Sequence, residues 1–290
     1  MKIIKYIGGL GNQMFIYAFS VVLKDKFGEE VLADTHYYNE HNFHNGLELE
    51  KIFDIKLHRA SIWNIIKLSW FIPGYYLDFH LCRRLPKRKR TYYEHVGGAC
   101  DKSLLQNDPG DQYYWGFWQD HSYYDDYRDV LRKVFRFKND LNEKNQQLYD
   151  EIEMSDSSVG IHIRRGDYLN NKKYMGICDV DYYSKGITYI KSKIHNPFFY
   201  IYSNDMEWCK QNIVPIIGEN RLIYVDWNKG DNSYIDMQLM SRCKSLIIAN
   251  SSFSWWAAYL NDRDPLVISP QKWKNNYCGF DFHLPNWITF

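Results

Sequence analysis

One short segment combines a histidine and arginines in a pattern that could bind an anion. Residues 159–163 are apolar at alternate positions, and His162 and Arg164 occupy the other phase of that alternation. Because alternate side chains of a strand share a face, His162 and Arg164 should emerge together where the strand ends. A guanidinium offers a rigid fork of donors that suits a diphosphate. The alternative is an ion-pair network of Arg164, Arg165 and Asp167 that binds no ligand.

A second candidate anion site follows another apolar run. Asn250, Ser251 and Ser252 come directly after the strand expected at residues 245–249, and Phe253 lies in the first turn of the helix expected at 252–260. The first turn of a helix has unpaired N–H groups and the positive end of the helix dipole. One of the three polar side chains should also cap this helix.

Two further segments could contact a ligand. Asp205 follows the strand expected at 198–203, where its carboxylate could accept from ribose or a guanine edge, or could cap the next helix. Near the N-terminus, Gly9 and Gly11 allow close backbone approach, followed by Asn12, the expected helix N-cap, and Gln13. Gln13 breaks the G-x-G-x-x-G pattern and no Gly-Lys-Ser/Thr follows, which disfavours a dehydrogenase or an ATPase.

The sequence gives little support for a metal site. Asp179 and Asp181 fit the D-x-D spelling of metal-dependent sugar transferases, but they precede a helix expected at 180–194 and are better explained as its cap and dipole partner. The ten histidines, including His36, show no helical metal spacing.

The elements that must position these residues alternate between strand and helix. Further strands are expected at 2–7, 92–95, 113–116, 222–225 and 265–268, and further helices at 12–27, 123–134, 141–152, 205–212 and 232–242. Such alternation predicts an α/β fold with parallel sheets and helices on both faces. Ligands bind at the carboxyl ends of the strands in such sheets. We expect two Rossmann-like domains, residues 1–155 and 156–290.

Composition excludes several classes of protein. The 290 residues are 45% hydrophobic and 24% charged, with 36 Lys+Arg against 35 Asp+Glu and a net charge of +1. This balance disfavours disorder and nucleic-acid binding. The six cysteines form no C-x-x-C pair, so neither zinc nor a disulfide framework is expected. Without a signal peptide or an apolar run of membrane-spanning length, we expect a cytoplasmic protein.

One segment favours contact with a membrane surface. Residues 62–81 are apolar and aromatic, and the eight residues from Arg83 to Arg90 carry six cations. An amphipathic stretch beside a basic cluster could dock on the anionic inner face of the plasma membrane. The alternative is a solvated basic loop after a buried helix.

Four of these segments together resemble a known family. They are GGLGNQMFIYAF at 8–19, HIRRGDY at 162–168, FFYIYSND at 198–205 and DMQLMSRCKSLIIANSSFSWWAAYL at 236–260. In this order, they resemble the bacterial α-1,2-fucosyltransferases of glycosyltransferase family 11, which also includes the blood-group H enzymes. Residues 35–105 match poorly, as expected for loops that face the acceptor.

The resemblance implies a function and a set of site residues. It implies a glycosyltransferase-B-like fold whose two domains face a cleft, and metal-independent, inverting transfer of fucose from GDP-fucose to the 2-hydroxyl of a terminal β-galactoside. It places Arg164, Ser251 and Ser252 at the donor phosphates, with Asn250 and Phe253 in the same turn. His162 falls near the nucleoside and Asp205 at guanine or ribose. The loop with Gly9, Gly11, Asn12 and Gln13 falls near fucose and acceptor.

Three rival functions stay open at this stage, and so does the general base. The rivals are a metal-dependent hexosyltransferase using Asp179 and Asp181, a lectin-like module, and a fucosyltransferase that makes another linkage. Asp167 is the candidate base by position, although it could instead anchor Arg165, and a dissociative route needs no strong base. The acceptor glycan and the oligomeric state are not predicted.

Overall fold

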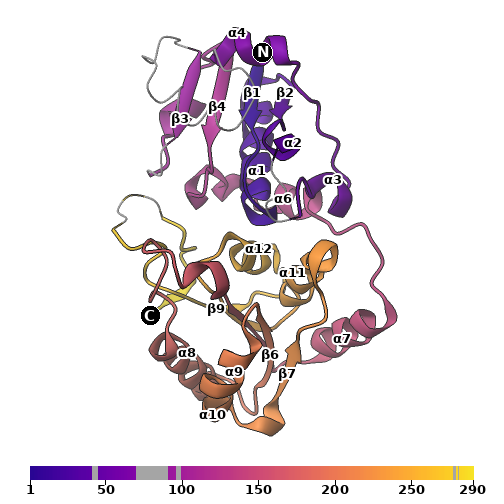
Figure 1. The fold of residues 1–290 in the computed structure, drawn as a ribbon, viewed down its shortest axis with the longest axis vertical. Helices are drawn as coiled ribbons and strands as arrows, with labels where there is room; N and C mark the ends of the chain where they lie inside the picture. The colour runs from indigo at the N-terminus through magenta and orange to yellow at the C-terminus, as the bar shows by residue number, and fades with distance from the viewer. Residues whose placement is uncertain (41–44, 70–90, 96–98, 277–278, 280) are drawn as a thin grey trace. The chain divides into compact units, whose positions relative to one another are not determined.

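The computed structural model describes the whole chain except residues 41–44, 70–90, 96–98, 277–278 and 280 (Figure 1). The chain divides into two compact units, Met1–Lys138 with Cys278–Phe282 and Asn139–Tyr277 with His283–Phe290. We call them unit 1 and unit 2. The basic cluster from Arg83 to Arg90 lies outside the described residues.

The division between the units falls earlier than the expected 155/156 boundary, because helix α7 (Glu143–Met154) belongs to unit 2. Two contacts hold α7 there. Its Asn145 exchanges hydrogen bonds with Asn228, and its Glu153 accepts from Arg242 at 2.6 and 2.9 Å. Helix periodicity alone does not reveal which core a helix joins.

Unit 1 is built on a parallel sheet in the order β2-β1-β4-β3, and the loop after β1 leads into helix α1 (Leu10–Phe27). Gly28 ends α1 in the left-handed conformation (φ 68°), as the sequence predicts. The predicted N-cap is wrong, since Gly9 holds that position and the helix begins at Leu10. The remaining elements are β1 (Lys2–Lys5), β2 (Val31–Asp34), β3 (Tyr92–His95), β4 (Gln112–Gly116), α2 (Tyr37–Glu40), α3 (Leu49–Ile52), α4 (Ile62–Ser69), α6 (Arg128–Val134) and the 3₁₀ turns Lys102–Leu105, His121–Tyr123 and Asp125–Tyr127.

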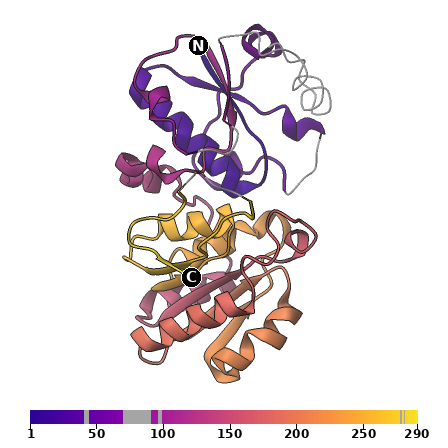
Figure 2. The same cartoon turned by 90° about the vertical axis from the view of Figure 1, so that its left-hand side faces the viewer.

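Unit 2 is a second parallel sheet, in the order β10-β9-β8-β5-β6-β7, with helices on both faces. Figures 1 and 2 show α8, α9 and α10 on one face and α11 and α12 on the other. Apolar side chains of α8 such as Ile187 pack on Ile161 and Ile201 of the central strands. The elements are β5 (Ser158–Ile163), β6 (Phe198–Ser203), β7 (Leu222–Val225), β8 (Ser245–Ile247), β9 (Leu266–Ser269), β10 (Ile288–Thr289), α8 (Val180–Lys193), α9 (Met206–Asn212), α10 (Val214–Ile217), α11 (Tyr234–Met240), α12 (Ser252–Leu260) and the 3₁₀ turns Gly166–Tyr168, Glu219–Arg221 and Gly230–Asn232.

Two other sequence expectations can be compared with the described part of the chain. The four cysteines in it, Cys100, Cys178, Cys209 and Cys243, are free thiols. In the described residues, no helix combines the length and the apolar character needed to cross a bilayer.

Candidate functional site

The strands of unit 2 bring the residues predicted to bind the sugar donor to one edge of the sheet. Strand β5 pairs in parallel with β6 on one side and with β8 on the other. The segments that begin with Arg164, Asn204 and Asn250 therefore all leave from the carboxyl ends of neighbouring strands. This is the edge at which α/β sheets bind ligands.

His162 is a buried, uncharged imidazole at this edge. Its ring lies 5.6 Å from the ring of Phe253, and within the described residues its buried Nδ1 has no hydrogen-bond partner. Burial, with a smaller contribution from the Arg164 charge, lowers the pKa of His162 from 6.5 to about 3. A buried ring nitrogen without a partner carries a desolvation cost that a bound ligand could relieve.

Arg164 extends from the end of β5 and is about one third exposed. Its Nη2 lies 2.8 Å from Asp167 Oδ1, and its guanidinium lies 5.5 Å from the ring of Tyr168. The Tyr168 hydroxyl donates to the backbone oxygen of Asn250 at 3.3 Å, which joins the loop after β5 to the turn after β8. Arg164 and the serine turn are thus linked through Tyr168, by a cation–π contact on one side and a hydrogen bond on the other.

The N-terminus of α12 is open, contrary to the expectation that Asn250, Ser251 or Ser252 caps it. Ser251 holds the N-cap position, and no side chain among the described residues caps the helix. The Asn250 side chain instead donates to Trp273 O at 3.1 Å and accepts from the Cys178 thiol at 3.4 Å. Ser252 and Phe253 are partly exposed, whereas Asn250 and Ser251 are buried. The first-turn N–H groups are therefore left for a ligand or for solvent.

Asp205 has a structural role, as one of its two predicted alternatives proposed. It is the N-cap of α9 and accepts from Trp208 N at 3.1 Å. Its other oxygen accepts from Arg165 Nε at 3.1 Å, and the Arg165 guanidinium lies 4.1 Å from the Trp208 ring. Asp167 therefore does not anchor Arg165 and pairs with Arg164 instead.

The glycine loop forms a separate cluster within unit 1. Gly9 and Gly11 flank Leu10, and Asn12 Oδ1 accepts from Gln119 at 2.9 Å. Gln13 is fully buried: its Nε2 donates to Gly8 O and Gly46 O, and its Oε1 accepts from Glu48 N. Gln13 holds the loop in shape, and the partly exposed Asn12 is the better placed of the two to meet a ligand.

The D-x-D pair is explained by helix capping. Asp179 caps α8 by accepting from Tyr182 N at 3.0 Å, and Asp181 pairs with Lys185 at 2.6 Å. The described residues contain no group of three or more His, Cys, Asp or Glu side chains arranged to hold a metal ion. His36, in unit 1, bonds to Asp34 at 2.9 Å.

Asp236, in α11, is a candidate site residue that the motif analysis did not select. It is half-buried, and burial raises its pKa to about 7, opposed by a hydrogen bond from Asn228. Perturbed carboxylates of this kind concentrate in functional sites. Asp236 belongs to the same face of the sheet as His162, because α11 packs beside α12. In addition, Tyr202 is the register partner of His162 on β6, and the Asp236 charge contributes to the raised pKa of Tyr202.

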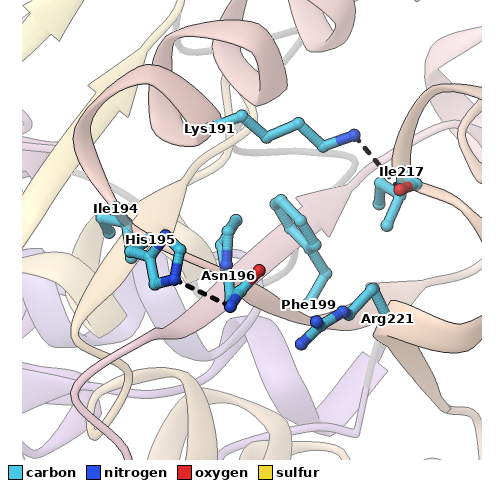
Figure 3. A pocket seen from close by; sticks show the side chains of 8 residues that line it. Lys191, Ile194, His195, Asn196, Phe199, Ile217 and Arg221 are labelled. Atoms are coloured by element: carbon cyan, nitrogen blue, oxygen red, sulfur yellow. Dashed lines mark hydrogen bonds between the residues drawn. The ribbon is translucent and has the colours of Figure 1, made fainter.

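A pocket of about 390 Å³ lies elsewhere in unit 2, around the start of β6 (Figure 3). Its lining includes Lys191, His195 and Arg221, and Lys191 Nζ donates to the Ile217 carbonyl at 3.1 Å. The amino end of β6 is opposite the edge that carries Arg164, so this pocket is separate from the predicted site.

Comparisons with known proteins identify the family to which this two-unit α/β chain belongs. The family model for glycosyl transferase family 11 matches residues 74–290. The chain belongs to this family.

The relatives and the solved structures give further detail. The chain is 32% identical over 287 residues to an α-1,2-colitosyltransferase of Escherichia coli, covering 97% of this chain and 96% of the relative. It is 30% identical over 305 residues to the E. coli O-antigen biosynthesis glycosyltransferase WbnK, covering 97% and 98%. Mouse galactoside α-(1,2)-fucosyltransferase 2 is 26% identical over 273 residues, covering 92% and 70%.

Among solved structures, NodZ α-1,6-fucosyltransferase soaked with GDP-fucose superposes with a TM-score of 0.53 at 15% identity, covering 89% of this chain and 91% of NodZ. This likeness confirms the predicted glycosyltransferase-B-like fold. At such low identity it carries no information on donor or linkage.

The buried imidazole leads to a prediction about stability and pH. His162 stays neutral in the folded protein down to about pH 3, whereas in the unfolded chain it is protonated below about 6.5. The unfolded state therefore binds more protons between these values, and stability falls as the pH falls. His162→Gln should remove up to about 3 kcal/mol of the loss in unfolding free energy between pH 7 and 4. Urea titrations at several pH values measure it.

The exposed His195 gives the matched control. His195→Gln should leave the pH dependence of the wild-type protein in place. If the unfolding free energy of His162→Gln falls between pH 7 and 4 as much as that of the wild type, the imidazole is not buried in its neutral form.

Proposed function

We propose that this protein transfers L-fucose from GDP-fucose to the 2-hydroxyl of a terminal β-galactoside, with inversion and without a metal ion. The observation that carries the proposal is the open N-terminus of α12 joined to Arg164 through Tyr168 and Asn250. This edge combines a cation, a serine hydroxyl and first-turn N–H groups, which is the chemistry that a diphosphate needs. The relatives matched over more than 90% of this chain include an α-1,2-colitosyltransferase and a galactoside α-(1,2)-fucosyltransferase.

The donor residues stabilise the leaving group in this mechanism. The bond between fucose C1 and the β-phosphate oxygen breaks, its electron pair passes to GDP, and the sugar develops oxocarbenium character. Arg164, the Ser252 hydroxyl and the N–H groups of α12 face the growing negative charge on the phosphate. Preorganised donors of this kind are usually the largest contribution to rate acceleration. With these donors in place, a metal ion is not needed to stabilise the negative charge on the diphosphate.

The nucleoside is assigned to the face that carries His162, Phe253 and Asp236. The partly exposed Phe253 offers an aromatic ring for the base, backed by the uncharged His162 ring 5.6 Å away. The Asp236 carboxylate accepts from the N–H groups of the base edge. Asp236 takes the role that the family resemblance gave to Asp205, because both Asp205 oxygens already accept hydrogen bonds.

The acceptor is assigned to unit 1, with Asn12 and the glycine loop as its first contacts. The acceptor 2-hydroxyl attacks C1 from the side opposite GDP and loses its proton. Asp167 is the candidate base in unit 2: it is more than half exposed, and its Oδ1 pairs with Arg164. Asp167 then releases this proton to solvent, and departure of GDP lets the carboxylate pair with Arg164 again before the next cycle.

A second candidate function differs in the donor. The 32% identity to an α-1,2-colitosyltransferase over nearly the whole of both chains favours GDP-colitose, whose sugar lacks the 3-hydroxyl of fucose. The reacting atoms and the linkage would be the same. A fucosyltransferase that makes another linkage remains the third candidate.

A panel of donors and acceptors tests the proposal. The purified protein is supplied with GDP-fucose or GDP-colitose and with lactose, N-acetyllactosamine or a Galβ1,3-terminated oligosaccharide, and GDP release and product linkage are measured. We expect galactoside-dependent GDP release from GDP-fucose and an α-1,2 product. GDP-fucose left unused beside active GDP-colitose would favour the second candidate. A linkage to another hydroxyl would overturn the acceptor assignment.

Removal of divalent cations tests the metal-independent mechanism. In excess EDTA, kcat should stay within about twofold of its untreated value, since the donors of α12 and Arg164 carry the electrostatic stabilisation. A loss that magnesium or manganese restores would support the metal-dependent alternative. The variant Asp181→Asn, which removes the partner of Lys185 only, should behave as the wild type in both conditions.

Contact with the inner membrane surface through Arg83 to Arg90 stays a prediction from the sequence. Work on lipid-linked O-antigen glycans would fit it, given the relative named for O-antigen biosynthesis.

A further inference from the structure

Two buried asparagines form a reciprocal amide pair behind Asp236. Asn145 of α7 donates from Nδ2 to Asn228 Oδ1 at 2.9 Å, and Asn228 Nδ2 donates back to Asn145 Oδ1 at 3.0 Å. Asn145 is fully buried and Asn228 is 8% exposed. Such a pair joins helix α7 to the loop that follows β7.

The remaining hydrogen bonds fix which way the Asn228 amide points. Asn145 also donates to Asn142 Oδ1 at 3.0 Å and accepts from Trp227 Nε1 at 2.9 Å, so its own amide is fully used. Asn228 must then turn its Nδ2 toward Asn145 Oδ1, and the same nitrogen donates to Asp236 Oδ1 at 2.8 Å. A flipped Asn228 would present its oxygen to the carboxylate, which is unfavourable when Asp236 is ionised.

This network acts on one carboxylate at the ligand-binding edge. The loop with Trp227 and Asn228 leaves the carboxyl end of β7, beside the strands that lead to Arg164 and Asn204. Among the described residues, only Asn228 is hydrogen-bonded to the carboxylate of Asp236, and it donates to Oδ1. Tyr202 from β6, whose titration depends in part on the Asp236 charge, stays protonated because burial raises its pKa. Lys144 from α7 lies over the ring of Trp227, the neighbour of Asn228. Oδ2 is therefore the oxygen left for a ligand.

We propose that Asn145 and Asn228 are positioning residues for donor binding, which hold Asp236 ionised and oriented toward the nucleoside of GDP. The proposal rests on the proposed function, because it needs GDP as the ligand. Burial of Asp236 favours its neutral form, and the Asn228 donor opposes that effect. Without this donor, Asp236 would hold its proton at neutral pH and lose an acceptor for the base.

The test is GDP binding, measured by titration calorimetry between pH 6.5 and 9. In the wild type, GDP affinity should fall as the pH falls through about 7, where Asp236 takes up a proton. Asn228→Ala should raise the pH midpoint of GDP binding by about one unit, because Asp236 loses the donor that favours its ionised form. The smaller ionised fraction of Asp236 should then weaken GDP binding about threefold at pH 7.5. GDP titrates identically in every sample, so the difference between variants reports on the protein.

A double-mutant cycle separates positioning from general damage to the fold. Asp236→Asn should weaken GDP binding and flatten its pH dependence, and adding Asn228→Ala should weaken it no further. Gln146→Ala, which removes an exposed bond to Asp150 on the same helix, is the matched control and should match the wild type. If Asn228→Ala does not fold, Asn228→Ser takes its place, since a serine hydroxyl is too short to reach both partners.

The outcomes distinguish the inference from the function it rests on. An unchanged pH midpoint in a folded Asn228 variant, or an effect that adds fully to Asp236→Asn, would overturn the positioning role. Wild-type protein that does not bind GDP at any pH would overturn the proposed function itself.

Discussion

Arg164→Ala should lower kcat with GDP-fucose by at least about 100-fold, the scale on which loss of one key charge-stabilising donor acts. Arg164 is the cation at the end of β5, joined to the turn of α12 through Tyr168 and Asn250. Charge builds on the diphosphate as the sugar departs, so the loss should fall on kcat more than on KM. Initial rates of GDP release in the presence of a galactoside measure the effect.

The fold should tolerate this change. In the ion pair of Arg164 with Asp167, the arginine is partly exposed and the aspartate is more than half exposed. Loss of this pair should therefore cost no more than about 1 kcal/mol of unfolding free energy. Arg164→Lys keeps the charge without the fork and should retain intermediate activity. Lys185→Ala, which removes another exposed ion pair, is the control. Wild-type turnover in a folded Arg164→Ala protein would refute the phosphate assignment.

Ser252→Asp should make the protein more stable and inactive. Ser252 is the first residue of α12, whose N-terminus has no side-chain cap among the described residues. A carboxylate there interacts favourably with the helix dipole and should raise the unfolding free energy by about 0.5 kcal/mol. The same charge would face the donor diphosphate, and like charges in contact cost several kcal/mol, so GDP affinity should fall by at least about 100-fold.

Ser252→Asn is the matched control, since it has the size of aspartate without its charge. It should bind GDP within about tenfold of the wild type, in line with the loss of one neutral hydrogen bond. Thermal melts and GDP titrations on the three proteins give both readouts. Strong GDP binding by Ser252→Asp would show that the anion does not lie at this helix.

Most strands and helices of unit 2 were predictable because they carry a strong local signal. Phe198–Ser203, Leu222–Val225 and the helix Ser252–Leu260 have the bounds that the sequence predicts. β2 (Val31–Asp34) and β10 (Ile288–Thr289) were missed, and the two residues of β10 are too few to show the alternation of a strand. The unit boundary was placed late because α7 joins the second core through Asn145 and Glu153, which are contacts between distant parts of the chain.

The candidate site was predictable only where it depends on local pattern. Alternation along β5 places His162 and Arg164 at the strand end, as expected. The sequence offers no means of deciding that Asp205 caps a helix while Asp236, inside a helix, is partly exposed. The same limit applied to Ser251, a favoured capping residue whose hydroxyl does not cap α12.

The return of residues 278–282 to unit 1 has a consequence for biogenesis. In unit 1, Asp281 O accepts from His121 N at 3.1 Å and Asp281 N donates to Asp120 Oδ2 at 3.3 Å, across about 160 positions of sequence. A nascent chain that has left the ribosome only as far as Lys138 therefore lacks part of its first core. A fragment cut at the junction should therefore be a less stable folding unit than unit 1 within the whole chain.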